Sequence, residues 1–177
     1  MSKPTDGGEH LLVVVDMQED FVRGSLATAE AQAIVQAVVD KVRSHVGPLA
    51  YTLDTHHEDY LSTSEGRHLP VVHCVKGEAG HRLIAELTLL LENAEVYEKP
   101  TFGSVALAKR IEEDPKLASV ELVGVCTDIC VVSNALMIKA MRPGLEVRVD
   151  AACCAGSTPE RHNAALETMK SCQIEGL

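Results

Sequence analysis

The chain has 177 residues, a net charge of −10 and 46% hydrophobic residues. This length and hydrophobicity exclude a disordered chain and predict a single domain over residues 1–177. The acidic charge disfavours nucleic acid as a partner, because the phosphate backbone is also negative. No apolar run reaches the roughly 18 residues of a membrane span, and residues 1–10 are polar. We therefore expect no membrane partner and a cytoplasmic protein.

Aromatic and cysteine usage narrow the class further. The chain has no Trp, two Phe and three Tyr, so its core must be aliphatic, as in a parallel sheet buried on both faces. Its six cysteines contain no CxxC pair, which disfavours a zinc ribbon. A disulfide framework is typical of short secreted chains and is not expected here.

Strand-like and helix-like segments alternate along the chain. In order, we expect a strand at 11–15, a helix at 29–46, a strand at 49–53, an irregular connection at 56–80, a helix at 81–92, a strand at 94–97, a helix at 105–113, a strand at 120–125, a helix at 128–141, a strand at 147–149, a helix at 159–172 and a short strand from residue 174. This order predicts an α/β fold with a mostly parallel sheet of five or six strands and helices on both faces, a Rossmann-like three-layer architecture.

Polar residues follow the predicted strands. Asp16, Asp54, Lys99, the segment 126–130 and Asp150 all stand at predicted carboxyl ends. Ligand sites of open α/β sheets form beyond these ends, so we expect side chains from separate segments to converge there.

Cys130 is the candidate nucleophile. In GVCTDICVV it stands in the first turn of a predicted helix, whose N–H groups and dipole would lower the thiol pKa and hold an oxyanion. Asp16 follows an apolar strand, where burial would raise its pKa and suit it to general-base catalysis. Lys99 could orient this acid and balance charge. Taken alone, the same residues also fit a core cysteine, a strand-end acid and a solvated lysine.

Metal-ligand residue types collect in the connection at 56–80. Asp54 and His56 form a D-x-H pair at a strand end, and His73 returns after a loop that also holds Glu65. Such a set suits zinc, iron or manganese, although the spacing matches no simple zinc motif and solvated histidines remain an alternative. Asp150 and the capping pattern from Ser157 onward are interpreted as structural.

Four segments in order resemble the isochorismatase-like cysteine hydrolases, and within them the nicotinamidase branch. They read VVVDMQEDFVRGSL, TLDTHHEDY with LPVVHCVKGEAG, EKPTFGS, and LVGVCTDICVVSNA. The resemblance implies an amide hydrolase in which Asp16 deprotonates Cys130, the thiolate forms a thioester, and Lys99 holds the acid. It also implies an oxyanion hole from the backbone N–H groups of Cys126 and Cys130, and a cis peptide bond between Val125 and Cys126.

The resemblance further implies a divalent metal, zinc or alternatively iron or manganese, on Asp54, His56 and His73. Glu65 is the candidate fourth ligand. The metal would hold the pyridine nitrogen of nicotinamide, and the reaction would feed NAD salvage. The family also implies a homo-oligomer, either a dimer or a tetramer.

Some positions depart from the family pattern. Residues 69–72, LPVV, replace the aromatic wall that usually precedes the last metal histidine, which leaves Phe21 and Phe102 as the candidate substrate-binding rings. Tyr60 stands near the place of a third loop histidine, and Cys126 stands where Ala is frequent.

Three alternatives remain beside nicotinamide hydrolysis. The first is a related cysteine hydrolase of another small amide or carbamoyl compound. The second is a vinyl-ether hydrolase of the isochorismatase type, against which Cys130 argues. The third is a non-catalytic binding protein with the same fold, against which the complete set of Asp16, Lys99 and Cys130 argues.

Overall fold

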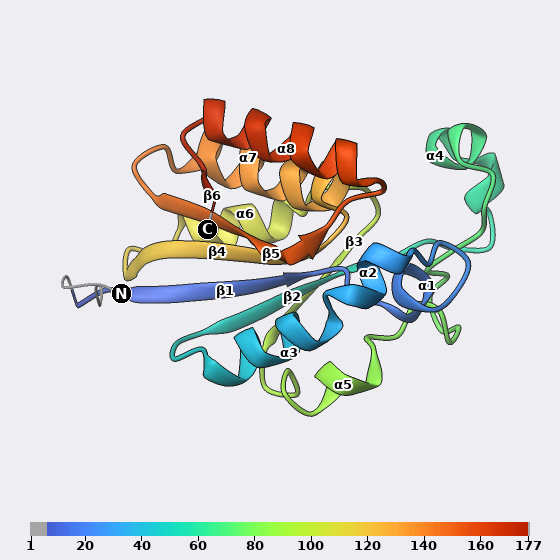
Figure 1. Cartoon of the computed structure of the whole chain (residues 1–177), viewed down its shortest axis with the longest axis horizontal. Helices are drawn as coiled ribbons and strands as arrows, with labels where there is room; N and C mark the ends of the chain where they lie inside the picture. Colours follow the sequence, from blue (N-terminus) through green and yellow to red (C-terminus); the bar gives the residue numbers. More distant parts are fainter. Residues whose placement is uncertain (1–6, 177) are drawn as a thin grey trace.

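A computed structural model describes residues 7–176 of the chain (Figure 1). Residues 1–6 of the polar N-terminal segment lie outside this range, as does residue 177. The expected alternation of strands and helices is confirmed. The strands are β1 (Glu9–Val15), β2 (Leu49–Asp54), β3 (Glu95–Lys99), β4 (Leu117–Val125), β5 (Glu146–Ala155) and β6 (Glu175–Gly176).

These six strands form one sheet in the order β3-β2-β1-β4-β5-β6, and each pair of neighbours is parallel. The central strand β1 pairs on both sides, with Val14 opposite Tyr51 of β2 and Val123 of β4. Because all strands point the same way, their carboxyl ends meet at one edge of the sheet, as the sequence predicts.

Helices cover both faces of the sheet. They are α1 (Glu19–Val22), α2 (Ala29–Ala33), α3 (Val35–Ser44), α4 (Ser64–His68), α5 (Ala85–Thr88), α6 (Val105–Glu112), α7 (Val132–Met141) and α8 (Pro159–Ser171), with a short 3-10 turn at Tyr60–Ser62 and a π-helical turn at Thr127–Val131. In Figure 1, α6, α7 and α8 lie on one face, and α2, α3 and α5 lie on the other. The segment that carries α4 projects from the body at the end where the strands stop.

Each face of the sheet has its own aliphatic core, which matches the scarcity of aromatic residues. On one face, Val13 and Leu122 pack with Ile138 of α7. On the other, Val14 and Val123 pack with Val38 of α3. Alternate residues of β1 and β4 therefore enter opposite cores, as expected for central strands buried on both sides. Within residues 7–176, no helix combines the length and the apolar character that crossing a membrane requires.

Gly124 brings β4 close to β1 at the edge where the polar residues converge. Its φ is +117°, and a Cβ at this position would lie 2.1 Å from the carbonyl oxygen of Val15. Any side chain would therefore push β4 away from the end of β1, immediately before Asp16.

Several predicted elements differ from the structure. The helix expected at 29–46 is two helices, because Ile34 forms both the C-cap of α2 and the N-cap of α3. The prediction of a helix at 81–92 is mostly wrong, because only α5 (Ala85–Thr88) is helical in this range. Leu83 instead forms a bridge with Gln18, and the Ile84 amide donates to the Met17 carbonyl.

The predicted end of the strand at 147–149 is also wrong. β5 continues to Ala155, because Cys154 pairs with Gly124 beyond a shift in register. Asp150 therefore lies within β5 and not at its carboxyl end. Its carboxylate is 2.6 Å from Nζ of Lys41, which supports the structural interpretation of this residue.

Candidate functional site

Asp16 lies immediately after β1 with its side chain fully buried. Its φ is +49°, a left-handed conformation that is uncommon outside glycine and often marks functional positions. Thr52 of β2 donates a hydrogen bond of 2.6 Å to Oδ1 of Asp16. The Asp16 amide donates to the Thr52 carbonyl at 3.3 Å, so β2 fixes both the backbone and the side chain of the acid.

Lys99 ends β3 and joins the polar residues of this edge. Its Nζ lies 2.6 Å from Oδ2 of Asp16, 3.4 Å from Oδ1 of Asp54 and 3.4 Å from Sγ of Cys130. The residue is 1% exposed, so the solvated lysine that the sequence left open is excluded. One buried ammonium group therefore contacts two carboxylates and a thiol.

Cys130 lies in the π-helical turn that follows β4 and is 5% exposed. The peptide bond between Val125 and Cys126 is cis, as predicted. The Cys126 carbonyl accepts hydrogen bonds from the amides of Ile129 and Val131, at 3.0 and 3.1 Å. Among the described residues, the intervening amide of Cys130 does not donate to this carbonyl. The helix expected from residue 128 thus begins with a widened turn, and α7 follows from Val132.

Burial dominates the electrostatics of the reactive pair. It raises the pKa of Asp16 against the opposing effect of Lys99, as the sequence predicts. Burial also raises the pKa of the Cys130 thiol, and the charge of Asp16 adds to this effect. The prediction that the helix N-terminus lowers this thiol pKa is therefore wrong for the unliganded site, because desolvation outweighs the dipole.

Oδ2 of Asp16 is a buried acceptor whose partner is the ammonium group of Lys99, 2.6 Å away. This charged contact favours the ionised carboxylate and opposes the effect of burial on the pKa of Asp16. A buried acceptor of raised pKa beside a protonated thiol is suited to take that thiol's proton.

A second cluster adjoins the first. One ligand atom from each of four residues lies within 4.8 Å of the other three, and the residues are Asp54, His56, Glu65 and His73. Asp54 Oδ2 is 2.9 Å from Nε2 of His56 and 3.3 Å from Nε2 of His73. Glu65 Oε1 is farther away, at 3.7 and 3.8 Å from the same two nitrogen atoms. The structure therefore brings all four predicted ligands together.

The chemistry of this donor set fits a divalent cation. Nδ1 of His73 lies 2.8 Å from the Val71 carbonyl, which can only accept, so Nδ1 carries a proton. Nε2, 3.3 Å from Oδ2 of Asp54, is therefore the nitrogen that would bind a cation, once it has given up any proton that it shares with Asp54. Burial and the neighbouring Asp54 raise the pKa of Glu65, a repulsion between carboxylates that a cation would relieve. Burial opposes ionisation of Asp54 too, but hydrogen bonds from the two histidines and the charge of Lys99 lower its pKa.

Tyr60 supports the two histidines. Its ring centroid lies 4.6 Å from that of His56 and 5.0 Å from that of His73. The Tyr60 hydroxyl donates to the Leu69 carbonyl at 2.8 Å, which connects the 3-10 turn to the chain leading to His73. Tyr60, which stands near the place of the third loop histidine implied by the resemblance, therefore packs against His56 and His73.

A cavity of about 700 Å³ opens beside the metal cluster. Its lining includes His56, Glu65, Phe102 and Ile129. Phe102 is 41% exposed, so its ring is accessible from this cavity. Phe21 is 8% exposed and packs against His73 at 5.7 Å between ring centroids, so only a small part of its ring could meet a ligand.

Three buried residues that hold the site are absent from the sequence-based set. Besides Thr52, Gln18 accepts from the Asp54 amide at 2.8 Å and donates to the Asp54 carbonyl at 2.9 Å. Asn134 donates to the Cys130 carbonyl at 2.8 Å and accepts from the Ser104 amide at 2.9 Å. Gln18 follows Asp16 by two residues and Asn134 follows Cys130 by four, and this spacing was the only sequence signal for either.

Comparison with known proteins agrees with this arrangement. The family model "Isochorismatase domain" matches residues 10–175. The chain is 28% identical over 187 residues to a nicotinamidase/pyrazinamidase of Mycobacterium tuberculosis, with 93% of this chain and 96% of that protein covered.

Two solved structures share the fold. The pyrazinamidase of Pyrococcus horikoshii in complex with zinc is 31% identical, with a TM-score of 0.81 over 96% of this chain and 98% of the other. The nicotinamidase/pyrazinamidase PncA of Bacillus subtilis is 26% identical, with a TM-score of 0.83 over 95% and 98% of the two chains. Since the family model spans nearly the whole described chain, and the sheet matches these structures, the chain belongs to the isochorismatase domain family.

Proposed function

We propose that this chain is a metal-dependent nicotinamidase, which hydrolyses nicotinamide to nicotinate and ammonia through a thioester on Cys130. The observation that carries the proposal is the position of Lys99, whose ammonium group contacts Asp16, Asp54 and Cys130 at the junction of the two clusters. The names of the relatives from Mycobacterium tuberculosis, Pyrococcus horikoshii and Bacillus subtilis support an amide substrate with a small heteroaromatic ring.

The first half-reaction forms the thioester. Asp16 takes the thiol proton as the sulfur of Cys130 attacks the amide carbon, and a carbon–sulfur bond forms. The negative charge that develops on the carbonyl oxygen is held by the backbone N–H groups of Cys126 and Cys130. Asp16 then returns the proton to the leaving nitrogen, the carbon–nitrogen bond breaks, and ammonia departs.

The second half-reaction releases the acid. Asp16 takes a proton from a water molecule as its oxygen attacks the thioester carbon, and the carbon–sulfur bond then breaks. The proton passes to the sulfur, which restores the thiol of Cys130. Burial lowers the pKa of Lys99, but Asp16, Cys130 and Asp54 raise it more, so Lys99 keeps a positive charge beside both reacting groups throughout.

Asp54, His56, His73 and Glu65 would hold the divalent metal, with zinc the first candidate and iron or manganese as alternatives. When bound, the metal would supply a Lewis-acid position for the ring nitrogen of the substrate. Phe102 would then offer a ring face to the bound heterocycle. The reaction would feed NAD salvage, and a dimer or tetramer is the proposed assembly.

A related amide is the second candidate, because the cavity of about 700 Å³ falls in the range that accommodates drug-sized ligands. Pyrazinamide and larger heteroaromatic or carbamoyl amides test this possibility. A substrate larger than nicotinamide would use the polar part of the lining, which includes Thr63, Ser64 and Thr101.

Ammonia release by the purified protein tests the proposal. Nicotinamide, pyrazinamide and a carbamoyl compound are compared before chelation, after chelation, and after zinc, iron or manganese is restored. We expect fast release from nicotinamide that chelation abolishes and metal restores. Release only from another amide would reject nicotinamide as the substrate, and release unaffected by chelation would reject the role of the metal.

A further inference from the structure

Asp20 of α1 belongs to neither cluster, yet its carboxylate contacts the chain beside a metal ligand. Its Oδ2 accepts a hydrogen bond of 2.7 Å from the amide of Cys74, the residue directly after His73. Its Oδ1 accepts a longer bond of 3.3 Å from the Ser25 amide. The carboxylate thus joins the loop after α1 to the loop that supplies His73.

The backbone at Cys74 requires such support. Its φ is +48°, a left-handed conformation that costs free energy for a residue with a side chain and persists only where the surroundings enforce it. Cys74 is also fully buried, so its amide has no access to water as an alternative partner. A charged acceptor at 2.7 Å makes a stronger hydrogen bond than a neutral one.

A second contact holds the other side of the same ligand. Ser25 Oγ donates to the Val72 carbonyl at 3.1 Å, so the residues before and after His73 are both attached to the segment that starts with α1. The ring itself is oriented by the bond between its Nδ1 and Val71. Past His73, a parallel bridge joins Val75 to His56, and the Cys74 carbonyl accepts from the His56 amide at 3.0 Å. Asp20 holds the amide side of the same residue, so the position of His73 depends on contacts from both the chain just after β2 and the segment that starts with α1.

The space around Asp20 leaves its carboxylate little freedom. A Cβ at Gly80 would lie 2.0 Å from Oδ2, and one at Gly24 would lie 2.3 Å from Oδ1. The Asp20 amide also donates to the Gly80 carbonyl at 3.1 Å. The carboxylate is therefore packed directly on the backbone of two glycines, in an orientation that faces Cys74.

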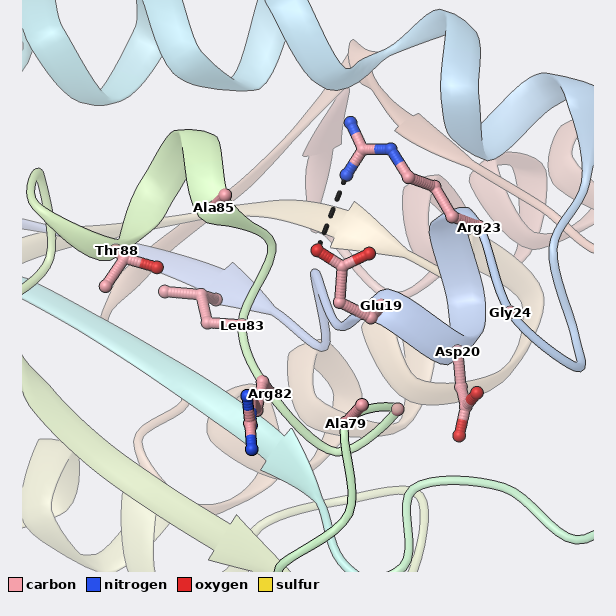
Figure 2. Close-up of a pocket in the computed structure, with 10 residues that line it drawn as sticks. Glu19, Asp20, Arg23, Gly24, Ala79, Arg82, Leu83, Ala85 and Thr88 are labelled. Atoms are coloured by element: carbon pink, nitrogen blue, oxygen red, sulfur yellow. Dashed lines mark ion pairs between the residues drawn. The ribbon is translucent and has the colours of Figure 1, made fainter.

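The adjacent carboxylate on α1 differs. Figure 2 shows Glu19 pointing toward Arg23, 3.6 Å away, while Asp20 points away from this pair. Glu19 and Asp20 thus share a helix and a charge, but of the two carboxylates only that of Asp20 accepts a hydrogen bond from the loop that supplies His73. Glu19 provides a matched control.

We propose that Asp20 is a positioning residue for the metal site, which holds His73 in its ligating orientation through the Cys74 amide. The inference rests on the proposed function, because it takes His73 as a ligand. Asp20 does not line the cavity beside the metal cluster and does not contact the reacting atoms. We therefore expect its substitution to change the affinity for the metal. Hydrogen-bonded partners of metal ligands typically change affinity about 10- to 100-fold when they are removed.

Zinc affinity of the purified protein, measured by competition with a chromophoric chelator and without substrate, tests this role. We expect Asp20→Ala to weaken zinc binding about 10- to 100-fold. Asp20→Asn keeps an acceptor oxygen for Cys74 and should recover most of the affinity, whereas Glu19→Ala should bind zinc like the wild type. At saturating zinc, Asp20→Ala should retain a kcat close to that of the wild type.

A folded Asp20→Ala variant with zinc affinity within about twofold of the wild type would overturn the inference, even if its melting temperature falls. If Asp20→Ala does not fold, Asp20→Ser, whose hydroxyl is too short to reach the amide, is measured in its place with the same expected loss. Because no substrate is used, failure to hydrolyse nicotinamide leaves the result interpretable. A wild-type protein that binds none of zinc, iron and manganese would overturn both proposals.

Discussion

The reactive cluster of Asp16, Lys99 and Cys130 adjoins the metal cluster where Lys99 lies 3.4 Å from Asp54, its partner across β2 and β3. The two clusters are nevertheless built in different ways. The reactive groups come from strand ends and the turn after β4, and their exposed fractions are 5% or less. Of the four proposed metal ligands, only Asp54 ends a strand, while the other three belong to the long connection between β2 and α5. The strand ends of the sheet therefore position the reactive residues, whereas hydrogen bonds within loops position most of the proposed metal ligands.

The two carboxylates beside Lys99 show what this difference does to charge. Burial raises the pKa of Asp16 more than the contacts with Lys99 and Thr52 lower it. Hydrogen bonds from two histidines overcome burial at Asp54 and lower its pKa. The same ammonium group thus serves a carboxylate suited to accept protons and another that stays anionic, as a base and a metal ligand respectively must.

The largest expected effect is on the reactive cluster alone. Cys130→Ala should lower turnover by roughly 10⁴-fold or more, because it removes the atom that forms the covalent bond. Zinc affinity should be unchanged, since Cys130 is not part of the metal set. The exposed Cys172→Ala is the matched control and should keep full activity. Turnover by Cys130→Ala at the wild-type rate would end its assignment as the nucleophile.

Lys99→Met should damage both clusters, because Lys99 is the group that they share. It leaves two buried carboxylates without their cation, and loss of one partner of a buried ion pair costs about 3–5 kcal/mol. Lys76→Met removes an exposed pair with Glu98 and should cost about 1 kcal/mol or less. Urea unfolding of the two variants measures the difference. Equal destabilisation would show that Lys99 is not the electrostatic centre of the site.

His73→Ala should affect the metal cluster alone. We expect zinc affinity to fall about 100-fold, because a buried nitrogen that would bind the metal directly is lost, while the free energy of unfolding of the metal-free protein changes less. The KM for nicotinamide should rise more than kcat falls. His57→Ala, at an exposed histidine of the same connection, is the control. Unchanged metal content in His73→Ala would remove this residue from the ligand set.

The resting state of the nucleophile predicts a dependence on pH. Because burial raises the pKa of Cys130, the thiol is protonated at neutral pH, and its thiolate fraction should increase about tenfold per pH unit below that pKa. The rate of alkylation by iodoacetamide, followed by peptide mass spectrometry, should therefore still rise above pH 9. The exposed Cys172 confirms that the reagent is active at each pH. A rate that levels off by pH 7 would contradict the raised pKa.

The sequence predicted most of the fold because its strands are continuous aliphatic runs. The alternation of elements, the parallel sheet and the convergence of Asp16, Asp54, Lys99 and Cys130 all follow from these runs and from the rule for strand ends. Asp150 failed the same rule, since β5 runs five residues past it. A run of Ala and Cys carries little periodicity, so the true end of the strand had no local signal.

The rest of the site depends on contacts between distant segments. Gln18 bonds to the backbone of Asp54, Asn134 to the Ser104 amide and Asp20 to the Cys74 amide, and each of these groups approaches its partner only in the folded chain. The thiol pKa was predicted in the wrong direction for a similar reason. The helix position is local, whereas the burial that outweighs it is produced by the whole fold.

Substitution of Glu65 should have the smallest effect, and it tests most directly how much the loop contributes to zinc affinity. It lies on α4, which projects from the body in Figure 1, and its carboxylate is more exposed and more distant from the histidines than that of Asp54. Glu65→Gln keeps the shape but weakens the ligand, so zinc affinity should fall about tenfold or less, and kcat should be nearly unchanged once zinc saturates. Asp54→Asn should lower zinc affinity more than Glu65→Gln does, because the Asp54 carboxylate also neutralises Lys99. Equal losses in the two variants would mean that α4 holds its ligand as firmly as β2 does, and the contrast between strand and loop would not apply to the metal site.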